Sequence, residues 1–186
     1  FFFILGAIQC TMAQSVQTIR GKMPAQKMGL TLVHEHVFLD WTGAERMQAS
    51  AWNNDSAVAV ILPYLRKMQS HGVKTILECT PNYIGRNPRL LARLADSTGL
   101  HILTNTGYYG ARWDNHIPAH AYRESVDQIA ARWLEEFNHG IDGTTIRPGF
   151  IKIGVDGDSL LSEIDEKIVR AAARTHLRSG LTIVAH

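Results

Sequence analysis

Two histidines placed two residues apart are the first feature of this sequence that could support chemistry. They are His34 and His36, inside the apolar segment of residues 30–37. On a β-strand, residues i and i+2 point to the same face, so both imidazoles would converge on one side of a sheet. Neutral imidazoles are common ligands of zinc. The pattern alone is weak, because an exposed or structurally hydrogen-bonded pair of histidines has the same spacing.

Lys152 and His186 are two further polar residues in apolar surroundings. Lys152 stands between Ile151 and Ile153, and a lysine buried in such a strand is costly unless its charge is neutralised or paired. A lysine that loses its charge could be carboxylated, which would make it a ligand able to bridge two metal ions. His186 ends the run of residues 181–186. In barrel enzymes the catalytic groups come from the carboxyl ends of several strands.

The elements that must position these residues alternate between short and long apolar patterns. The short runs are rich in Val, Ile, Leu and Thr, as in strands buried on both faces. They cover residues 30–37, 74–79, 101–106, 149–155 and 181–186. Helical patterns lie between them, at residues 54–71, 87–97, 123–137 and 164–179. This alternation predicts an α/β fold with a parallel sheet.

The helix expected at residues 164–179 has recognisable start and stop signals. Ser162 precedes the acidic residues of the first turn and Gly180 follows the last turn, the usual positions of an N-terminal cap and a C-terminal stop. About five strand and helix units are counted, whereas an eight-unit barrel needs roughly 250 residues. An incomplete TIM barrel, (β/α)8, and a short open doubly wound sheet both fit this count.

Composition and charge exclude several classes of protein. Of 186 residues, 45% are hydrophobic and 19% are charged, which is ordinary for a globular domain and not for a disordered chain. The net charge of +2 and the scattered basic residues give no footprint for nucleic acid. With only Cys10 and Cys79, no disulfide framework is indicated.

Five short segments, in order along the chain, carry a family resemblance. They are residues 29–40 (GLTLVHEHVFLD), 79–81 (CTP), 84–87 (IGRN), 106–109 (TGYY) and 140–144 (GIDGT), the last leading into Ile151 and Lys152. This set resembles the phosphotriesterase family of the amidohydrolase superfamily, from about Gly21 to the last residue. The resemblance implies a metal-dependent hydrolase built on a (β/α)8 barrel.

The resemblance also implies roles for individual residues. His34 and His36 would hold a first divalent metal ion and His186 a second. Lys152, as its carboxylate adduct, would bridge both ions and so take part in catalysis, with zinc the expected metal. Tyr109 would lie in the substrate pocket near the metals, or else be an aromatic residue at the rim without contact to the substrate.

Three further statements follow from the same resemblance. Arg86 is expected to have a structural role below the site, and Glu78 to lie at its strand end without a catalytic role. The family pattern also includes a histidine from the sixth strand and an aspartate from the eighth, which lie outside these 186 residues. The chain by itself is therefore expected to be inactive.

The first thirteen residues read as part of a secretory signal. Residues 1–10 are largely apolar and uncharged, and the small-residue stretch 11–13 follows them, as in a hydrophobic region before a cleavage site. The run is too short to span a bilayer of roughly 30 Å. We expect residues 14–186 to be the N-terminal part of the hydrolase barrel, in a periplasmic or secreted protein. A buried N-terminal strand, with a cytoplasmic location, is the alternative.

For the complete enzyme, the resemblance implies hydrolysis of an ester, lactone or phosphotriester by a metal-bridging hydroxide. The partner would be a small-molecule substrate, and the complete protein would be a homodimer. An amidase acting on N-acylated small molecules is an alternative within the superfamily. A non-catalytic metal-binding or scaffold protein is an alternative of another class. An open α/β protein with a fortuitous pair of histidines is disfavoured by the ordered set of motifs.

Overall fold

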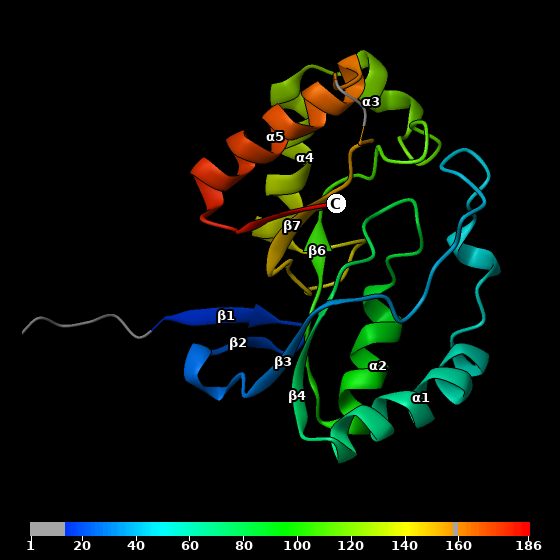
Figure 1. Ribbon diagram of the computed structural model, residues 1–186, viewed down its shortest axis with the longest axis vertical. Coiled ribbons are helices and arrows are strands. Elements are labelled where there is room, and N and C mark those ends of the chain that lie inside the picture. Colours follow the sequence, from blue (N-terminus) through cyan, green and yellow to red (C-terminus); the bar gives the residue numbers. More distant parts are fainter. Residues whose placement is uncertain (1–13, 158–159) are drawn as a thin grey trace, which may run out of the picture.

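Parallel strands alternate with helices along most of the chain, as the sequence predicts (Figure 1). The computed structural model describes residues 14–157 and 160–186. The expected signal segment, residues 1–13, lies outside the described residues. No helix in the described ranges is long and apolar enough to cross a membrane.

The barrel strands follow one another in space in the order of the sequence. They are β3 (Leu30–Glu35), β4 (Val73–Glu78), β5 (His101–Leu103), β6 (Asn105–Thr106), β7 (Phe150–Ile153) and β8 (Ile183–Ala185). β5 and β6 are two parts of one strand position, separated by Thr104: β5 pairs with β4, whereas β6 pairs with β7. All of these pairs are parallel.

The helices connect neighbouring strands. They are α1 (Asn54–Ser70), α2 (Pro88–Thr98), α3 (Ala119–Arg123), α4 (Val126–His139) and α5 (Glu163–Ser179), with short 3-10 helices η1 (Ala25–Lys27) and η2 (Ala49–Ala51). Figure 1 shows α1 and α2 beside the first strands and α4 and α5 beside β7. Right-handed crossovers between sequential strands put every helix on the same side of the sheet, whereas a doubly wound sheet needs a reversal of strand order. The fold is therefore part of a (β/α)8 barrel.

Side-chain alternation along β7 separates two hydrophobic cores. Ile151 and Ile153 point outward and pack with residues of α4 and α5. Phe150 points inward and packs with Cys79 and Leu103 in the barrel interior. Because successive residues of a strand face opposite sides, Lys152 shares the inward face of Phe150. The strand that builds the outer core therefore also delivers a lysine to the interior.

Local signals begin and end the helices as predicted. The Ser162 side chain accepts a hydrogen bond from the backbone N–H of Asp165 at 3.0 Å, and Gly180 ends α5 with a φ of 73°. Asn87 caps α2 in the same manner, and Gly99 ends that helix with a φ of 79°. Both glycines occupy the left-handed region that residues with a Cβ rarely adopt.

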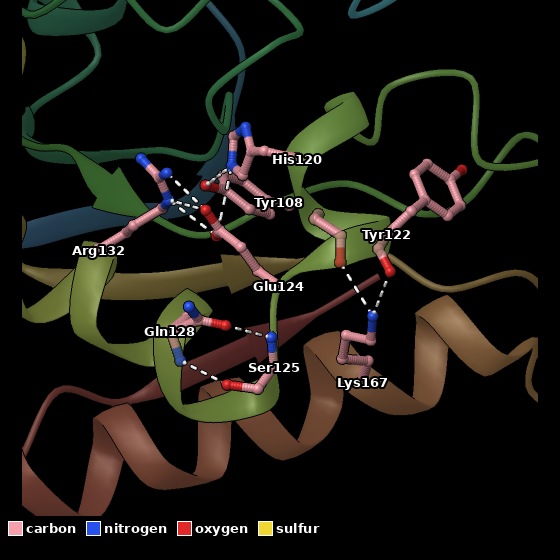
Figure 2. Close-up of polar contacts among 9 residues, drawn as sticks. Tyr108, His120, Tyr122, Glu124, Ser125, Gln128, Arg132 and Lys167 are labelled. Atoms are coloured by element: carbon pink, nitrogen blue, oxygen red, sulfur yellow. Dashed lines mark hydrogen bonds and ion pairs between the residues drawn. The ribbon is translucent and has the colours of Figure 1, made fainter.

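The helix expected at residues 123–137 corresponds to α4, which begins three residues later than predicted and is preceded by the separate short helix α3. α3 ends at Arg123 and α4 begins at Val126. Ser125 and Gln128 form a reciprocal capping box, in which each backbone N–H donates to the other's side chain (Figure 2). The box satisfies the amide groups at the start of α4, so the chain changes direction there.

A β-hairpin that the sequence patterns did not predict precedes the barrel. It consists of β1 (Ser15–Thr18) and β2 (Gly21–Pro24), paired antiparallel. The backbone N–H of Ile19 donates to the carbonyl of Ile102 at 2.8 Å, and a Cβ on Gly149 would lie 2.4 Å from the carbonyl oxygen of Gln17. The hairpin therefore contacts the start of the β5 and β7 strands, at the end opposite to the predicted site.

Gly107 allows a close approach of backbones that the barrel needs. Its φ is +128°, and a Cβ there would lie 1.9 Å from the Lys152 carbonyl oxygen. Gly72 has a φ of +88° with nothing within 4 Å of its Cβ position.

Gly72→Ala should lower the free energy of unfolding by about 1–2 kcal/mol, because the backbone conformation alone is unfavourable for alanine. Gly107→Ala should lower it by about 1–3 kcal/mol more, because β7 must also move. Urea denaturation of both variants measures the difference, and equal costs would contradict the close approach.

Candidate active site

Four residues predicted from the sequence come together at the carboxyl ends of the strands. The ring centroids of His34 and His36 are 5.2 Å apart, and those of His34 and His186 are 6.3 Å apart. The amino nitrogen Nζ of Lys152 lies 3.4 Å from Nε2 of His34. β3, β7 and the residue after β8 thus deliver three imidazoles and one amine to a single region of the barrel interior.

Lys152 is the most unusual member of this group. Its exposed fraction is 0%, and it takes part in no ion pair within the described part of the chain. Desolvation lowers the pKa of its ammonium group, and the nearby Cys79 opposes this shift only in part. A lysine in this environment is driven towards the neutral amine.

His34 in β3 and His36 directly after it are also held in their neutral form. Loss of hydration lowers the pKa of His36 to about 4, and the charges of His34, Lys152 and His186 add to the effect. The pKa of His34 is lowered for the same reasons, with desolvation again the largest cause. Neutral imidazoles keep a lone pair for a metal ion, so these shifts suit metal binding.

These side chains fit divalent metal ions if a further donor joins the histidines. Within residues 14–157 and 160–186, no group of three or more His, Cys, Asp or Glu side chains is placed to hold a metal ion. The histidines therefore need a further donor among them, and Lys152 is a buried residue whose Nζ lies 3.4 Å from His34. An amine that became a carboxylate would supply the anionic oxygen ligands that zinc accepts beside imidazoles.

Tyr109 lies beside His186, in agreement with its predicted neighbourhood. Its exposed fraction is 6%, and its ring centroid is 5.5 Å from that of His186. Both residues line a cavity of about 300 Å³ together with Arg112 and Asp156. Desolvation raises the pKa of the Tyr109 hydroxyl, so at neutral pH the phenol keeps its proton and can donate a hydrogen bond into this cavity.

Two aromatic neighbours of Tyr109 were not identified from the sequence. The Trp41 ring lies 6.0 Å from the Tyr109 ring, and the His116 ring 6.2 Å from it, measured between centroids. His116 is buried, with 2% exposure, so it packs within this aromatic group. The adjacent Tyr108 points away from this group and contacts Nε2 of His120 at 3.0 Å (Figure 2).

Arg86 has the structural position that was expected. Its side chain is fully enclosed and pairs with Glu136 at 2.6 Å, with Asp142 at 3.7 Å. One of its nitrogens also donates to the carbonyl of Asn105 at 3.0 Å. The Asn105 side chain in turn donates to the carbonyls of Glu78 and Thr80, at 2.9 and 3.1 Å. Arg86 thus supports the end of β4 from below and does not reach the histidines.

Residues 14–186 match the sequence profile of the phosphotriesterase family. The chain belongs to this family. It is 30% identical over 161 residues to the phosphotriesterase homology protein of Escherichia coli (strain K12), covering 85% of this chain and 52% of that protein. It is 26% identical over 204 residues to the human N-acetyltaurine hydrolase, covering 95% of this chain and 57% of that protein.

The match extends to solved structures of the phosphotriesterase family. The organophosphorus hydrolase from Deinococcus radiodurans superposes with a TM-score of 0.82 at 30% identity, over 92% of this chain and 53% of that one. The chain therefore spans about half the length of the relatives it matches. Its five strand positions are a part of the phosphotriesterase-family barrel.

The buried pair of Arg86 and Glu136 should be important for the stability of this region. Glu136→Gln leaves the enclosed guanidinium with only the more distant Asp142, and we expect a loss of about 3 kcal/mol in the free energy of unfolding. Glu166→Gln is the matched control, since the pair between Glu166 and Arg170 is exposed and should contribute at most about 0.5 kcal/mol. Thermal or urea unfolding compares them, and similar losses would contradict the role of Arg86.

Proposed function

We propose that this chain supplies ligands for two divalent metal ions in a phosphotriesterase-family hydrolase. His34 and His36 would hold the first ion and His186 the second, while Lys152, as a carboxylate, would contact both. Zinc is the expected metal, given imidazole and carboxylate donors. The observation that carries the proposal is the buried amine of Lys152, which lies 3.4 Å from an imidazole and has no acidic partner in the described ranges.

Carboxylation of Lys152 follows from ordinary amine chemistry. The neutral amine Nζ attacks the carbon of CO2, an N–C bond forms, one C=O electron pair moves to oxygen, and Nζ releases a proton. The product is a carbamate with one negative charge. The reaction needs the unprotonated amine, and the lowered pKa of Lys152 favours that form. The buried site thus favours the modification that would make the lysine a ligand.

The reaction proposed for the full-length protein is hydrolysis of an ester-type bond in a small molecule: a carboxylic ester, a lactone or a phosphotriester. Two bound divalent ions would acidify a water molecule and polarise the carbonyl or phosphoryl oxygen. The chain's own residues would hold these ions with neutral imidazoles, and Tyr109 would orient the substrate through its protonated hydroxyl beside His186. The likeness to an organophosphorus hydrolase supports this bond class.

A second candidate is hydrolysis of an amide in an N-acylated small molecule. The relative named N-acetyltaurine hydrolase supports it, because this chain matches that protein over 95% of its own length. The same ligands would serve, since in both reactions water attacks a polarised carbonyl or phosphoryl centre, and the reactions differ in the leaving group. A non-catalytic metal-binding role would use the ligands without turnover. A panel of lactones, aryl esters, phosphotriesters and N-acyl amides separates the three.

Lys152→Met tests the proposal while it keeps the buried volume of the side chain. In the full-length protein we expect about two zinc ions per chain, fewer in the variant, and a fall in activity beyond the roughly 10–100-fold that loss of a supporting residue costs. Lys167→Met is the matched control, because Lys167 donates hydrogen bonds to the carbonyls of Ala121 and Tyr122 on the outer surface, far from the predicted ligands (Figure 2). Metal analysis and hydrolysis rates measure both.

Two results would overturn the proposal. Full zinc binding and full activity in Lys152→Met would exclude the lysine as a ligand. A wild-type protein that binds no divalent metal would exclude the metal site itself. A wild-type protein that binds zinc but hydrolyses no member of the panel would favour the non-catalytic role.

A further inference from the structure

A line of three polar groups runs from His36 into the protein, away from the proposed metal ions. His36 follows β3, whereas Glu78 ends β4 and Thr80 comes two residues later. Nδ1 of His36 lies 3.0 Å from Oγ1 of Thr80, and the Thr80 hydroxyl makes a short hydrogen bond to Oε1 of Glu78. Imidazole, hydroxyl and carboxylate thus form a continuous chain between two neighbouring strands.

The inner end of this chain is enclosed and fixed. Glu78 is 1% exposed and Thr80 0% exposed. The backbone N–H of Val37 donates to Oε1 of Glu78 at 3.3 Å, and that of Thr80 to Oε2 at 3.4 Å. The Asn105 side chain holds the carbonyls of both residues from the other side. The carboxylate is therefore held in place independently of His36.

The direction of each hydrogen bond follows from counting protons. The Thr80 hydroxyl has one proton and two nearby oxygen acceptors, the Glu78 carboxylate and the Phe38 carbonyl, which lies 3.2 Å away. A charged and nearer acceptor makes the stronger bond, so the proton points to Glu78. The hydroxyl oxygen then has only lone pairs for His36, and Nδ1 of His36 must be the donor.

We propose that Glu78 and Thr80 are positioning residues that fix His36 in the tautomer with its proton on Nδ1. In that tautomer Nε2 has a free lone pair, on the side of the ring away from Thr80. The use of this lone pair for a metal ion rests on the proposed function, whereas the tautomer itself does not. His34 has a different partner: in the described part of the chain its ring contacts Nζ of Lys152, whereas the His36 ring contacts the hydroxyl of Thr80.

The tautomer of His36 can be read directly from the full-length wild-type protein without metal. Two-bond proton–nitrogen NMR spectra of protein with 15N-labelled histidine distinguish a ring protonated on Nδ1 from one protonated on Nε2. At pH 8, above the pKa of about 7 to which burial raises Glu78, we expect the Nδ1–H form of His36 to dominate. A dominant Nε2–H form would overturn the proposal, whatever any variant does.

Three substitutions test the pathway from Glu78 to the ring. Thr80→Val keeps the shape of the side chain but removes the hydroxyl, so His36 should become a mixture of tautomers and zinc affinity should fall roughly 10–100-fold. Thr80→Ser keeps a hydroxyl and should retain both the Nδ1–H tautomer of His36 and the zinc affinity. Glu78→Leu removes the carboxylate without touching the ring and leaves the Thr80 proton only the Phe38 carbonyl among the acceptors described above, so the preference of His36 for the Nδ1–H form should weaken. The His34 resonances are the internal control and should stay unchanged in all three.

The outcomes separate this proposal from the proposed function. A Thr80→Val protein that keeps both the wild-type tautomer and the wild-type zinc affinity would contradict the positioning role. If Thr80→Val does not fold, the comparison of wild type with Thr80→Ser and Glu78→Leu decides the same question. A full-length wild-type protein with the Nδ1–H tautomer that binds no zinc would support the positioning of His36 and contradict the metal site alone.

Discussion

The amino group of Lys152 lies inside the barrel, on a strand whose neighbouring residues are apolar, and this burial constrains the rest of the structure. An ammonium ion in such a place is costly without a partner, so the group must lose its proton or acquire a ligand. β7 cannot turn the side chain outward, because Ile151 and Ile153 occupy that face in the core beneath α4 and α5. The packing of Ile151 and Ile153 against the outer helices thus requires the amino group of Lys152 to lie in the interior.

Two sets of residues surround the Lys152 amino group: the predicted ligands beside it and the buried residues that support them. His34 and His186 approach from β3 and from the end of β8, and Tyr109 lies against His186. Behind His36, Glu78 and Thr80 supply a carboxylate and a hydroxyl near the end of β4. The Asn105 side chain donates to the backbone carbonyls of these two residues, and Arg86 donates to the carbonyl of Asn105. The rigid supports are therefore buried polar networks, while the groups proposed to meet metal and substrate lie at the open ends of the strands.

Much of this arrangement was readable from residue types and spacing. Short apolar runs predicted the strand positions, the two-residue spacing put His34 and His36 on one face of a strand, and Gly180 marked the end of α5. The β1–β2 hairpin was not predicted, because its short strands carry Lys22 and Gln17 and lack a clear apolar alternation. The break before α4 was missed, although Ser125 and Gln128 have the spacing of a capping box. The contact of Thr80 with His36 could not be predicted, since the register between β3 and β4 shifts between Leu32 and Glu35.

The central claim is that the buried amine of Lys152 becomes a carboxylate that holds metal ions. Carbon-13 NMR of the full-length protein, prepared with zinc and 13C-labelled bicarbonate, tests it directly. The account predicts one labelled carbamate resonance in the wild-type protein, absent from Lys152→Met and retained in Lys167→Met. A zinc-loaded wild-type protein without this resonance, or a Lys152→Met protein that keeps it, would contradict the claim.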